Sequence, residues 1–278
     1  MAEAADDSPV AADAADDTGH GLSGSPLRLL TFNMQVGIHT AAWHHYVTRG
    51  WQHLLPHPKR HRRLELIAGA ITPYDIVGLQ EVDGGSFRSG NVNQVDALAE
   101  TAHFPHRYQQ LNRNLGRLAQ HSNGLLSRLP ISHLEEHSLP GTLPGRGAIH
   151  ARFGEGEHAL HVFVTHLALG ARIQRKQLDY LGELIAPLKH VIVMGDLNCT
   201  LAQLRQHKGF CEALDSRPSK AINSYPAWQP RRGLDHILAS STLHIEHPST
   251  LSHLFSDHLP LAVEVHLPVA CQKALGLA

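Results

Sequence analysis

VIVMGDLNCT, at residues 191–200, is an apolar run that ends in a carboxylate, Asp196, and two positions later in a carboxamide, Asn198. A short apolar run bounded by polar groups is typical of a buried strand that ends at the edge of a sheet. Taken alone, Asp196 and Asn198 could form an ordinary turn or a helix N-cap after that strand. The residues elsewhere in the chain are therefore needed to distinguish an ordinary turn from a functional site.

Strands and helices follow one another along most of the chain. Apolar runs at 27–33 and 75–81 predict two strands, and residues 61–71 carry apolar side chains at helical spacing between them. The other expected elements are a helix at 91–102, two strands within 122–139 that turn at Leu129-Pro130, a hairpin of 148–153 and 159–167, a helix at 171–188, and strands at 234–240, 242–247 and 260–267. Hairpins mixed with strand–helix–strand units indicate an α/β sandwich of two sheets rather than a doubly wound parallel sheet.

The composition limits the class of protein. A chain of 278 residues with 42% hydrophobic and 18% charged residues suits one large α/β domain. We expect a disordered acidic tail at 1–25, which is rich in Ala and Asp without an apolar period, a folded domain at 26–269 and a C-terminal tail at 270–278. Because 24 Lys and Arg stand against 25 Asp and Glu, nucleic acid binding would need a local basic patch.

The cellular location is predicted from what the sequence lacks. The acidic N-terminal stretch does not have the pattern of a secretory signal, and no apolar run approaches the roughly 20 residues that span a bilayer. Three cysteines without a CxxC pair argue against a disulfide framework or a cysteine zinc site. We therefore expect a soluble, cytoplasmic protein, and a peripheral membrane enzyme is the alternative.

Polar side chains stand at the ends of several predicted strands. They are Asn33, Glu81, His166, Asp196 with Asn198, Asp235, and the triplet Ser256-Asp257-His258. Side chains at strand ends can converge on one edge of a sheet, where several carboxylates are unfavourable unless a metal or protons neutralise them. Oxygen ligands without cysteine favour Mg²⁺ or Mn²⁺ over zinc.

Each of these residues also has an ordinary structural explanation. Asn33 can be a turn residue, Glu81 a solvated charge, and His166 one of 24 scattered histidines. Asp235 can form a salt bridge with Arg231 or Arg232. The joint occurrence of all of them in one order argues against these separate explanations.

Seven short motifs occur in the order seen in one known family. They are TFN (31–33), LQE (79–81), SNGLLSR (122–128), THL (165–167), GDLN (195–198), LDHI (234–237) and SDHLP (256–260). By these motifs, residues 27–268 resemble the endonuclease/exonuclease/phosphatase superfamily, which includes pancreatic-type DNases, abasic-site endonucleases, neutral sphingomyelinases and inositol-polyphosphate phosphatases. GDLN followed by SDH is the most specific part. The resemblance implies a four-layered α/β sandwich, with two mixed β-sheets flanked by helices, and a metal-dependent hydrolase of phosphoric esters.

The resemblance also implies roles for the metal-side residues. Glu81 would be the principal ligand of Mg²⁺ or Mn²⁺, assisted by Asn33 and Asp257. Asp196 would orient or deprotonate the attacking water, and Asn198 would hold that water and a phosphoryl oxygen. One carboxylate that accepts from water and one amide that donates to the oxyanion would then explain the pair at the end of the 191–195 strand.

Three further roles concern the substrate side of the implied site. His258, supported by Asp235, would face the phosphate, and either His258 or Asp196 would be the formal base. His166 would face the leaving group, and Asn123 matches a recurrent substrate-side asparagine.

The chain departs from some members of the superfamily. Gln35 stands where abasic-site endonucleases often have an acidic ligand, and we find no clear counterpart of the tyrosine that they place near the phosphate. The chain therefore looks nearer to the DNase, sphingomyelinase and small-phosphoester branches.

Two other features could contact the substrate. Segment 36–60, which is rich in aromatic residues and histidine, could form an amphipathic helix packed on the body, or a substrate-side wall that includes Trp43. Arg117 and two other arginines on predicted loops, Arg88 and Arg113, could bind phosphate or merely be solvated.

Together these observations predict a metal-dependent phosphoesterase that hydrolyses a phosphodiester by in-line attack of an activated water. The sequence does not determine whether the phosphate-ester substrate is a lipid, a small phosphoester or nucleic acid. It does not determine the oligomeric state either. A DNase-like or abasic-site-like endonuclease is the nearest alternative. A non-catalytic scaffold that retains the fold is the alternative of another class.

Overall fold

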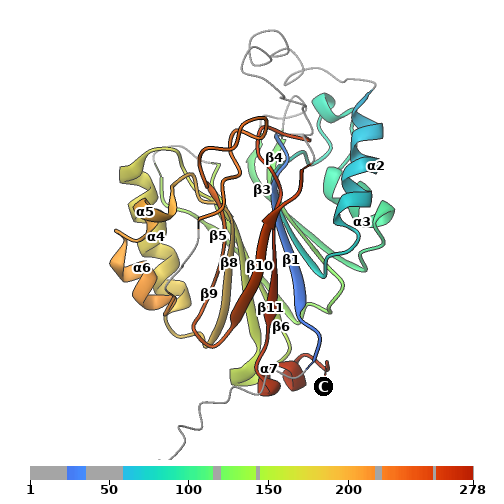
Figure 1. The fold of residues 1–278 in the computed structure, drawn as a ribbon. Helices are drawn as coiled ribbons and strands as arrows, with labels where there is room; N and C mark the ends of the chain where they lie inside the picture. Colours follow the sequence, from blue (N-terminus) through green and yellow to red (C-terminus); the bar gives the residue numbers. More distant parts are fainter. Residues whose placement is uncertain are drawn as a thin grey trace, which may run out of the picture.

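Two β-sheets pack face to face in the computed structural model, which describes residues 24–35, 59–114, 120–141, 145–216, 221–252 and 255–277 (Figure 1). The six-stranded sheet has the order β10-β11-β1-β2-β4-β3, formed by β1 (Leu27–Asn33), β2 (Ile76–Val82), β3 (His106–Asn114), β4 (Gln120–Ser127), β10 (His244–Thr250) and β11 (Leu261–His266). The five-stranded sheet has the order β5-β6-β7-β8-β9, formed by β5 (His133–Ser138), β6 (Gly147–Phe153), β7 (Leu160–His166), β8 (His190–Asp196) and β9 (Asp235–Ala239).

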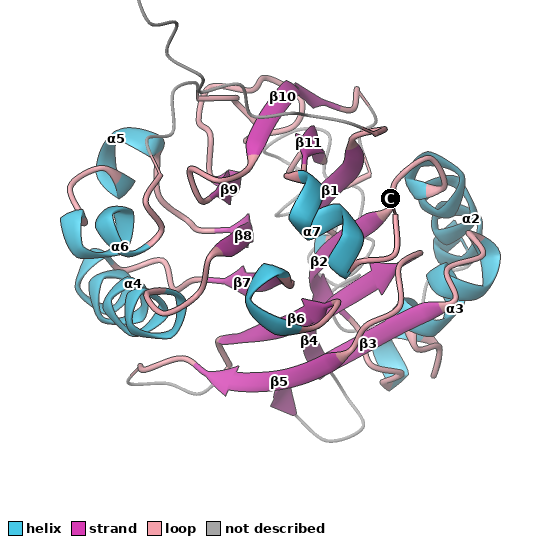
Figure 2. Ribbon diagram, turned by 90° about the horizontal axis from the view of Figure 1, so that it is seen from below, coloured by secondary structure: helices cyan, strands magenta, loops and turns pink. Residues whose placement is uncertain are grey.

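Helices cover the outer face of each sheet. On the six-stranded sheet these are α2 (Lys59–Ile71) and α3 (Gln94–Thr101), and on the five-stranded sheet α4 (Ala171–Ile185), α5 (Leu201–Leu204) and α6 (Lys208–Ala213). Figure 2, a view along the sandwich, shows the four layers side by side, with α7 (Val269–Ala274) at the near end. Two short 3-10 turns, η3 (Phe87–Ser89) and η4 (Gly156–His158), complete the described elements. The four-layered α/β sandwich predicted from the sequence is therefore confirmed.

The central strands are apolar on both faces because both faces are covered. In β1, Leu29 belongs to the core between the two sheets, whereas Leu30 and Phe32 belong to the core beneath α2 and α3. Gly78 in β2 lets the sheets approach closely, since a Cβ there would lie 3.1 Å from side-chain atoms of Val164 and Met194. Burial on both faces explains the continuous apolar runs, which would alternate with polar residues in a sheet exposed on one side.

The topology brings the carboxyl ends of four strands to the same end of the sandwich. β1 pairs with β2 in parallel, and β7 pairs with β8 in parallel. Parallel strands end at the same edge of a sheet, so the polar residues at 33, 81, 166 and 196 are carried to one place.

Some elements differ from the sequence-based expectation. β3 was not predicted, because its sequence HRYQQLNRN is largely polar and it forms an edge of the sheet. The two strands expected within 122–139 both exist, but β4 and β5 belong to different sheets. Residues 269–274, where a C-terminal tail was expected from 270 onward, form α7, and its Cys271 is fully buried in the core between the sheets. All three cysteines are unpaired.

Candidate active site

Three neighbouring strands place an aspartate, a histidine and a second aspartate in one row. Asp196, the last residue of β8, lies opposite His166 at the end of β7 and opposite Asp235 at the start of β9. All three side chains are at most 4% exposed. The register of the five-stranded sheet therefore assembles this row from residues 166, 196 and 235.

Asp196 is the centre of a group of polar contacts. Asn33, from the other sheet, donates its Nδ2–H to Asp196 Oδ2 over 3.0 Å. His166 Nε2 lies 3.4 Å and His258 Nε2 lies 3.8 Å from the same oxygen. Burial alone would raise the pKa of Asp196, but the neighbouring His258, and then His166 and Asn33, lower it below its usual range. The Asp196 side chain is therefore a carboxylate at neutral pH.

His258 is held from its other nitrogen by Asp235. Its Nδ1 lies 2.8 Å from Asp235 Oδ2, and the same oxygen accepts a hydrogen bond of 2.5 Å from Ser224 Oγ. Burial acts to lower the pKa of His258, but the charges of Asp235 and Asp196 outweigh burial and raise the pKa well above its ordinary value. The ring of Tyr225 lies 4.9 Å from the ring of His258, centroid to centroid. Asp235 thus pairs with His258, and the salt bridge considered for it with Arg231 or Arg232 is not its role here.

The GDLN turn has a structural function as well as a position in the site. Asp196 Oδ1 accepts from the backbone N–H of Asn198 at 2.9 Å, and Asn198 Nδ2 donates to the carbonyl of Leu167 at 2.9 Å. Asn198 has a φ of +51°. The turn considered from the sequence is therefore present, but it uses one carboxylate oxygen and leaves Oδ2 for the histidines and Asn33. Thr200, rather than Asp196 or Asn198, is the N-cap of α5.

The polar residues surround a cavity of about 360 Å³ at the end of the sandwich. Its lining residues are Asn33, Gln35, Glu81, Arg146, His166, Leu169, Asp196, Asn198, Tyr225, Arg232, Leu234, Asp257 and His258. Of the eleven site residues that the sequence predicts, seven line this cavity, and the buried Asp235 lies behind His258. The structure therefore brings together residues from 33 to 258, and both sheets contribute.

Glu81 reaches this cavity from a distorted part of β2. Its φ is +55°, and the pairing between β2 and β4 shifts register between Leu79 and Val82. Such an irregularity in the pairing can re-aim the side chains around it. A non-glycine residue at positive φ costs about 1–3 kcal/mol and persists only where its surroundings hold it there. Gln35, also on the cavity wall, has a φ of +44° and donates its N–H to Asn33 Oδ1 at 3.1 Å. Three of the seven described non-glycine residues at positive φ, at positions 35, 81 and 198, therefore line this cavity.

A second cavity of about 320 Å³ adjoins the first. Both cavities are lined by Glu81, Arg146, His166 and Leu169. Asn123 lines only the second, where its Nδ2 donates to the carbonyl of Gly147 at 3.0 Å. Asn123 is 1% exposed, so it lies in the floor of this cavity.

Arg146, which sequence reasoning missed, lies between the two cavities. Its Nη1 is 2.6 Å from His166 Nδ1. Burial lowers the pKa of Arg146, while the negative charges of Glu81 and Asp196 raise it, so the guanidinium faces two carboxylates of the site. Tyr225 and Ser224, beside His258 and Asp235, were also missed. A single Arg within PGRG, or a Tyr before Pro226, carries no signal by which these residues could have been found.

Two predicted substrate-binding residues, Trp43 and Arg117, lie outside the described residues, and so does nearly all of segment 36–60. Arg113 is described, and it lies near the end of β3 on the wall of the second cavity.

The family model named "Endonuclease/Exonuclease/phosphatase family" matches residues 30–258. The chain belongs to this family. The uncharacterized protein YbhP of Escherichia coli strain K12 is 29% identical over 214 residues, which are 69% of this chain and 83% of YbhP.

Solved structures support the same fold. An endonuclease/exonuclease/phosphatase from Beutenbergia cavernae DSM 12333 matches with a TM-score of 0.67 and 19% identity, over 88% of this chain and 72% of that one. A beta toxin mutant of Staphylococcus aureus with bound magnesium ions matches with a TM-score of 0.58 and 15% identity, over 86% of this chain and 99% of the toxin. At these identities, the likeness to the solved structures shows the fold.

Proposed function

We propose that this member of the family hydrolyses a phosphodiester by in-line attack of a water molecule, with Mg²⁺ or Mn²⁺ as cofactor. The observation that carries the proposal is the position of Asp196 Oδ2. This buried oxygen lies within 3.0–3.8 Å of side-chain nitrogens of Asn33, His166 and His258, on the wall of a cavity that Glu81 and Asp257 also line. An acceptor, several donors and further carboxylates around one cavity are the groups that phosphodiester hydrolysis needs.

The donor set fits a hard divalent cation. Asn33, Glu81 and Asp257 offer oxygen atoms on one cavity wall, and that lining contains no cysteine. Four carboxylates, at residues 81, 196, 235 and 257, are gathered at this end of the sandwich, and burial of such charges is unfavourable without compensation. When bound, the cation would polarise the phosphoryl oxygen and neutralise its charge. The beta toxin structure of the same fold contains magnesium ions, which supports this choice of cofactor.

The chain's own side chains would divide the remaining work. Asp196, an acceptor of hydrogen bonds only, would orient the attacking water and take its proton. His258, whose Nδ1 proton is directed at Asp235, would present Nε2 to the phosphate. His166 Nε2, 3.4 Å from Asp196 Oδ2, would serve the leaving oxygen, and Asn198 would position the water and a phosphoryl oxygen. Asn123 in the adjoining cavity would contact the part of the substrate beyond the phosphate.

Hydrolysis of bis(4-nitrophenyl) phosphate tests the proposed chemistry. We expect turnover with Mg²⁺ or Mn²⁺ that EDTA abolishes, and a loss of at least about 100-fold in kcat for Asp196→Asn, since positioned proton transfer contributes about 10²–10⁴-fold. Asp179→Asn, at an exposed position on α4, is the control and should keep full activity. A parent protein without metal-dependent turnover of any phosphoester would favour the non-catalytic scaffold instead.

The proposal also concerns the class of substrate. We favour a lipid or small phosphoester, and a DNase-like or abasic-site-like endonuclease is the alternative. None of the helices in the described ranges is long and apolar enough to cross a bilayer, and a cytoplasmic location stays a prediction. Hydrolysis rates on a panel of phospholipid, small diester and DNA substrates, measured against salt, separate the classes, because binding to DNA weakens steeply as salt rises.

A further inference from the structure

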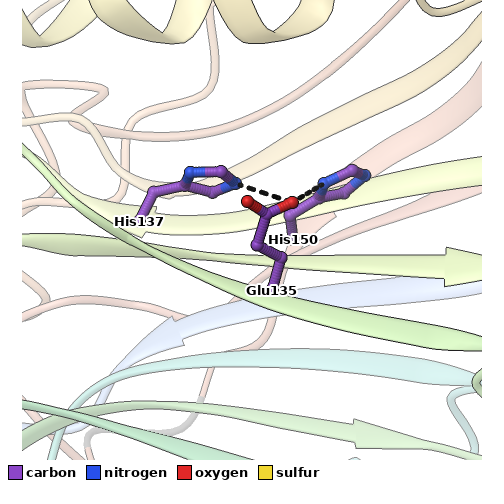
Figure 3. Close-up of side chains that lie close together, drawn as sticks. All are labelled: Glu135, His137 and His150. Atoms are coloured by element: carbon purple, nitrogen blue, oxygen red, sulfur yellow. Dashed lines mark ion pairs between the residues drawn. The ribbon is translucent and has the colours of Figure 1, made fainter.

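A second group of ligand-type side chains lies on the outer face of the five-stranded sheet. Glu135 and His137 are two residues apart on β5, and Glu135 lies directly opposite His150 on β6. Residues i and i+2 of a strand, and residues opposite one another across a pair, share a face of the sheet. Figure 3 shows the two rings directed at the Glu135 carboxylate. None of the three residues lines either cavity of the candidate active site.

The three groups approach one another without forming hydrogen bonds. Glu135 Oε2 is 3.8 Å from His137 Nε2 and 4.0 Å from His150 Nδ1. Each residue offers one ligand atom, and these three atoms all lie within 4.8 Å of one another. Two ligands at about 2.1 Å from a tetrahedral zinc ion are about 3.4 Å apart. The two contacts of Glu135 would therefore shorten by about 0.4–0.6 Å, and the two histidine nitrogens would approach to the same separation.

His137 Nε2 is an unsatisfied polar atom. The residue is only 6% exposed, and this atom has no hydrogen-bond partner among the residues that the structure describes. Buried polar atoms are nearly always paired, and the exceptions require an explanation such as an ion. His137 Nε2 is directed at a carboxylate that is too distant for a hydrogen bond, so a cation between them would satisfy both groups.

The opposite nitrogen of each ring has a partner that suits metal binding. His150 Nε2 lies 2.9 Å from His161 Nδ1, and His137 Nδ1 lies 3.3 Å from the Tyr180 hydroxyl. If each ring donates its proton to that partner, lone pairs remain on His150 Nδ1 and His137 Nε2, the atoms that face Glu135. Ligating histidines characteristically donate their second N–H to an acceptor such as a carboxylate, a backbone carbonyl or water, which fixes the tautomer. Here the imidazole of His161 and the hydroxyl of Tyr180 would be the acceptors.

A neighbouring aromatic ring also fixes the orientation of the His150 ring. His150 stacks on Phe163, with centroids 4.2 Å apart and an interplanar angle of 9°. This packing holds the ring in the orientation in which its Nδ1 faces the Glu135 carboxylate.

From this geometry we propose that Glu135, His137 and His150 form a binding site for Zn²⁺ that is separate from the proposed Mg²⁺ or Mn²⁺ site. Two imidazoles and one carboxylate suit zinc, with water in the fourth position, whereas the oxygen ligands of the other cavity suit a hard ion. Zinc bound here would tie β5, the edge strand of its sheet, to β6.

The test is titration of the metal-free, full-length protein with Zn²⁺ by calorimetry, in excess Mg²⁺ to occupy the hard-ion site. We expect Glu135→Gln to weaken one zinc-binding step at least about tenfold, because loss of an outer-shell partner alone costs about 10–100-fold. The Glu135 side chain is 55% exposed and the change is isosteric, so the fold should be retained, which circular dichroism checks. The visible spectrum of the Co²⁺-loaded protein should lose one component in the same variant.

His244→Gln is the matched control. His244, on β10, also lies beside a glutamate, with its Nε2 3.2 Å from Glu246 Oε1, but there the two groups are already hydrogen-bonded. The control should bind zinc as the parent does. Equal zinc affinity and stoichiometry in the parent and in Glu135→Gln, or a parent that binds no Zn²⁺ in the presence of Mg²⁺, would overturn the proposal. Neither outcome depends on whether the protein hydrolyses phosphodiesters.

Discussion

Arg146 determines which nitrogen of His166 carries the proton. Arg146 Nη1 lies 2.6 Å from His166 Nδ1, and a guanidinium group can only donate. His166 Nδ1 is therefore the acceptor, and the proton of the neutral ring is on Nε2, 3.4 Å from Asp196 Oδ2. This orientation presents an N–H to the cavity beside the carboxylate.

Arg146→Lys should therefore impair catalysis while leaving the fold intact. Lysine keeps the positive charge but does not reproduce the fixed direction of the guanidinium N–H. We expect kcat on a phosphodiester to fall by about 10–100-fold, as for other groups that orient a ligand or catalytic ring, and ¹⁵N NMR to show a change in the tautomer of His166. Arg152→Lys, at a surface ion pair with Glu155, is the control. An unchanged kcat together with an unchanged His166 spectrum would contradict this assignment.

Glu81→Gln should weaken metal binding and activity together. The change removes a charged ligand and keeps its size, so we expect the dissociation constant for Mn²⁺ to rise at least about tenfold, with activity partly restored by a higher metal concentration. Calorimetric titration with Mn²⁺ measures the first effect and phosphodiester turnover the second. Glu100→Gln, at an exposed position on α3, should do neither. If Glu81→Gln binds Mn²⁺ as tightly as the parent, Glu81 is not a ligand.

Gly195→Ala should destabilise the protein strongly. Gly195 has a φ of +146°, and a Cβ at this position would lie 1.8 Å from the carbonyl oxygen of Thr165 on β7. Backbone strain alone costs about 1–3 kcal/mol, and the clash adds to it. We expect a loss of at least this size in the free energy of unfolding, measured with chemical denaturant. Gly69→Ala in α2, where a Cβ would meet no atom of the described residues within 4 Å, should instead be neutral or stabilising by up to about 1 kcal/mol.

Acid should destabilise the fold partly through His190. Its Nδ1 is 2.9 Å from Thr242 Oγ1, and burial, followed by Lys189, His158 and His161, lowers the pKa of His190 to about 4. Because the unfolded chain takes up this proton near pH 6.5 and the folded protein only near pH 4, stability falls as the pH decreases through that interval.

Thermal unfolding of the parent and of His190→Gln between pH 7 and pH 4 tests this origin of acid sensitivity. The melting temperature of His190→Gln should decline less steeply with acid than that of the parent. Parallel declines would assign the acid sensitivity to other groups.

The sequence predicts the fold wherever burial leaves a pattern. β1, β2 and β8 have continuous apolar runs because they are covered on both faces, and the family motifs lie at their ends. β3 shows no such pattern, because an edge strand can be polar without loss of core packing. The assignment of β4 and β5 to different sheets depends on long-range pairing, which local sequence does not contain.

The residues of the candidate site likewise fall into two groups, those that the sequence predicts and those that it does not. Asp196, Asn33 and His258 lie within short motifs of fixed spacing, so their convergence could be predicted before the geometry was known. Arg146 and Tyr225 enter the site only because tertiary packing brings their loops beside it. Their local sequences are those of ordinary surface loops, and only the folded structure distinguishes them.

The hydrogen bond from Asn33 to Asp196 has a consequence for the order of folding. It joins residues 163 positions apart, one in each sheet. Contacts of such sequence separation form after local ones, because the chain must first lose the entropy of closing a long loop. During refolding, both sheets can therefore acquire secondary structure before the Asp196 carboxylate has its amide partner. Recovery of activity should lag behind recovery of the circular dichroism signal, which makes enzymatic turnover a reporter of the docking of the two sheets.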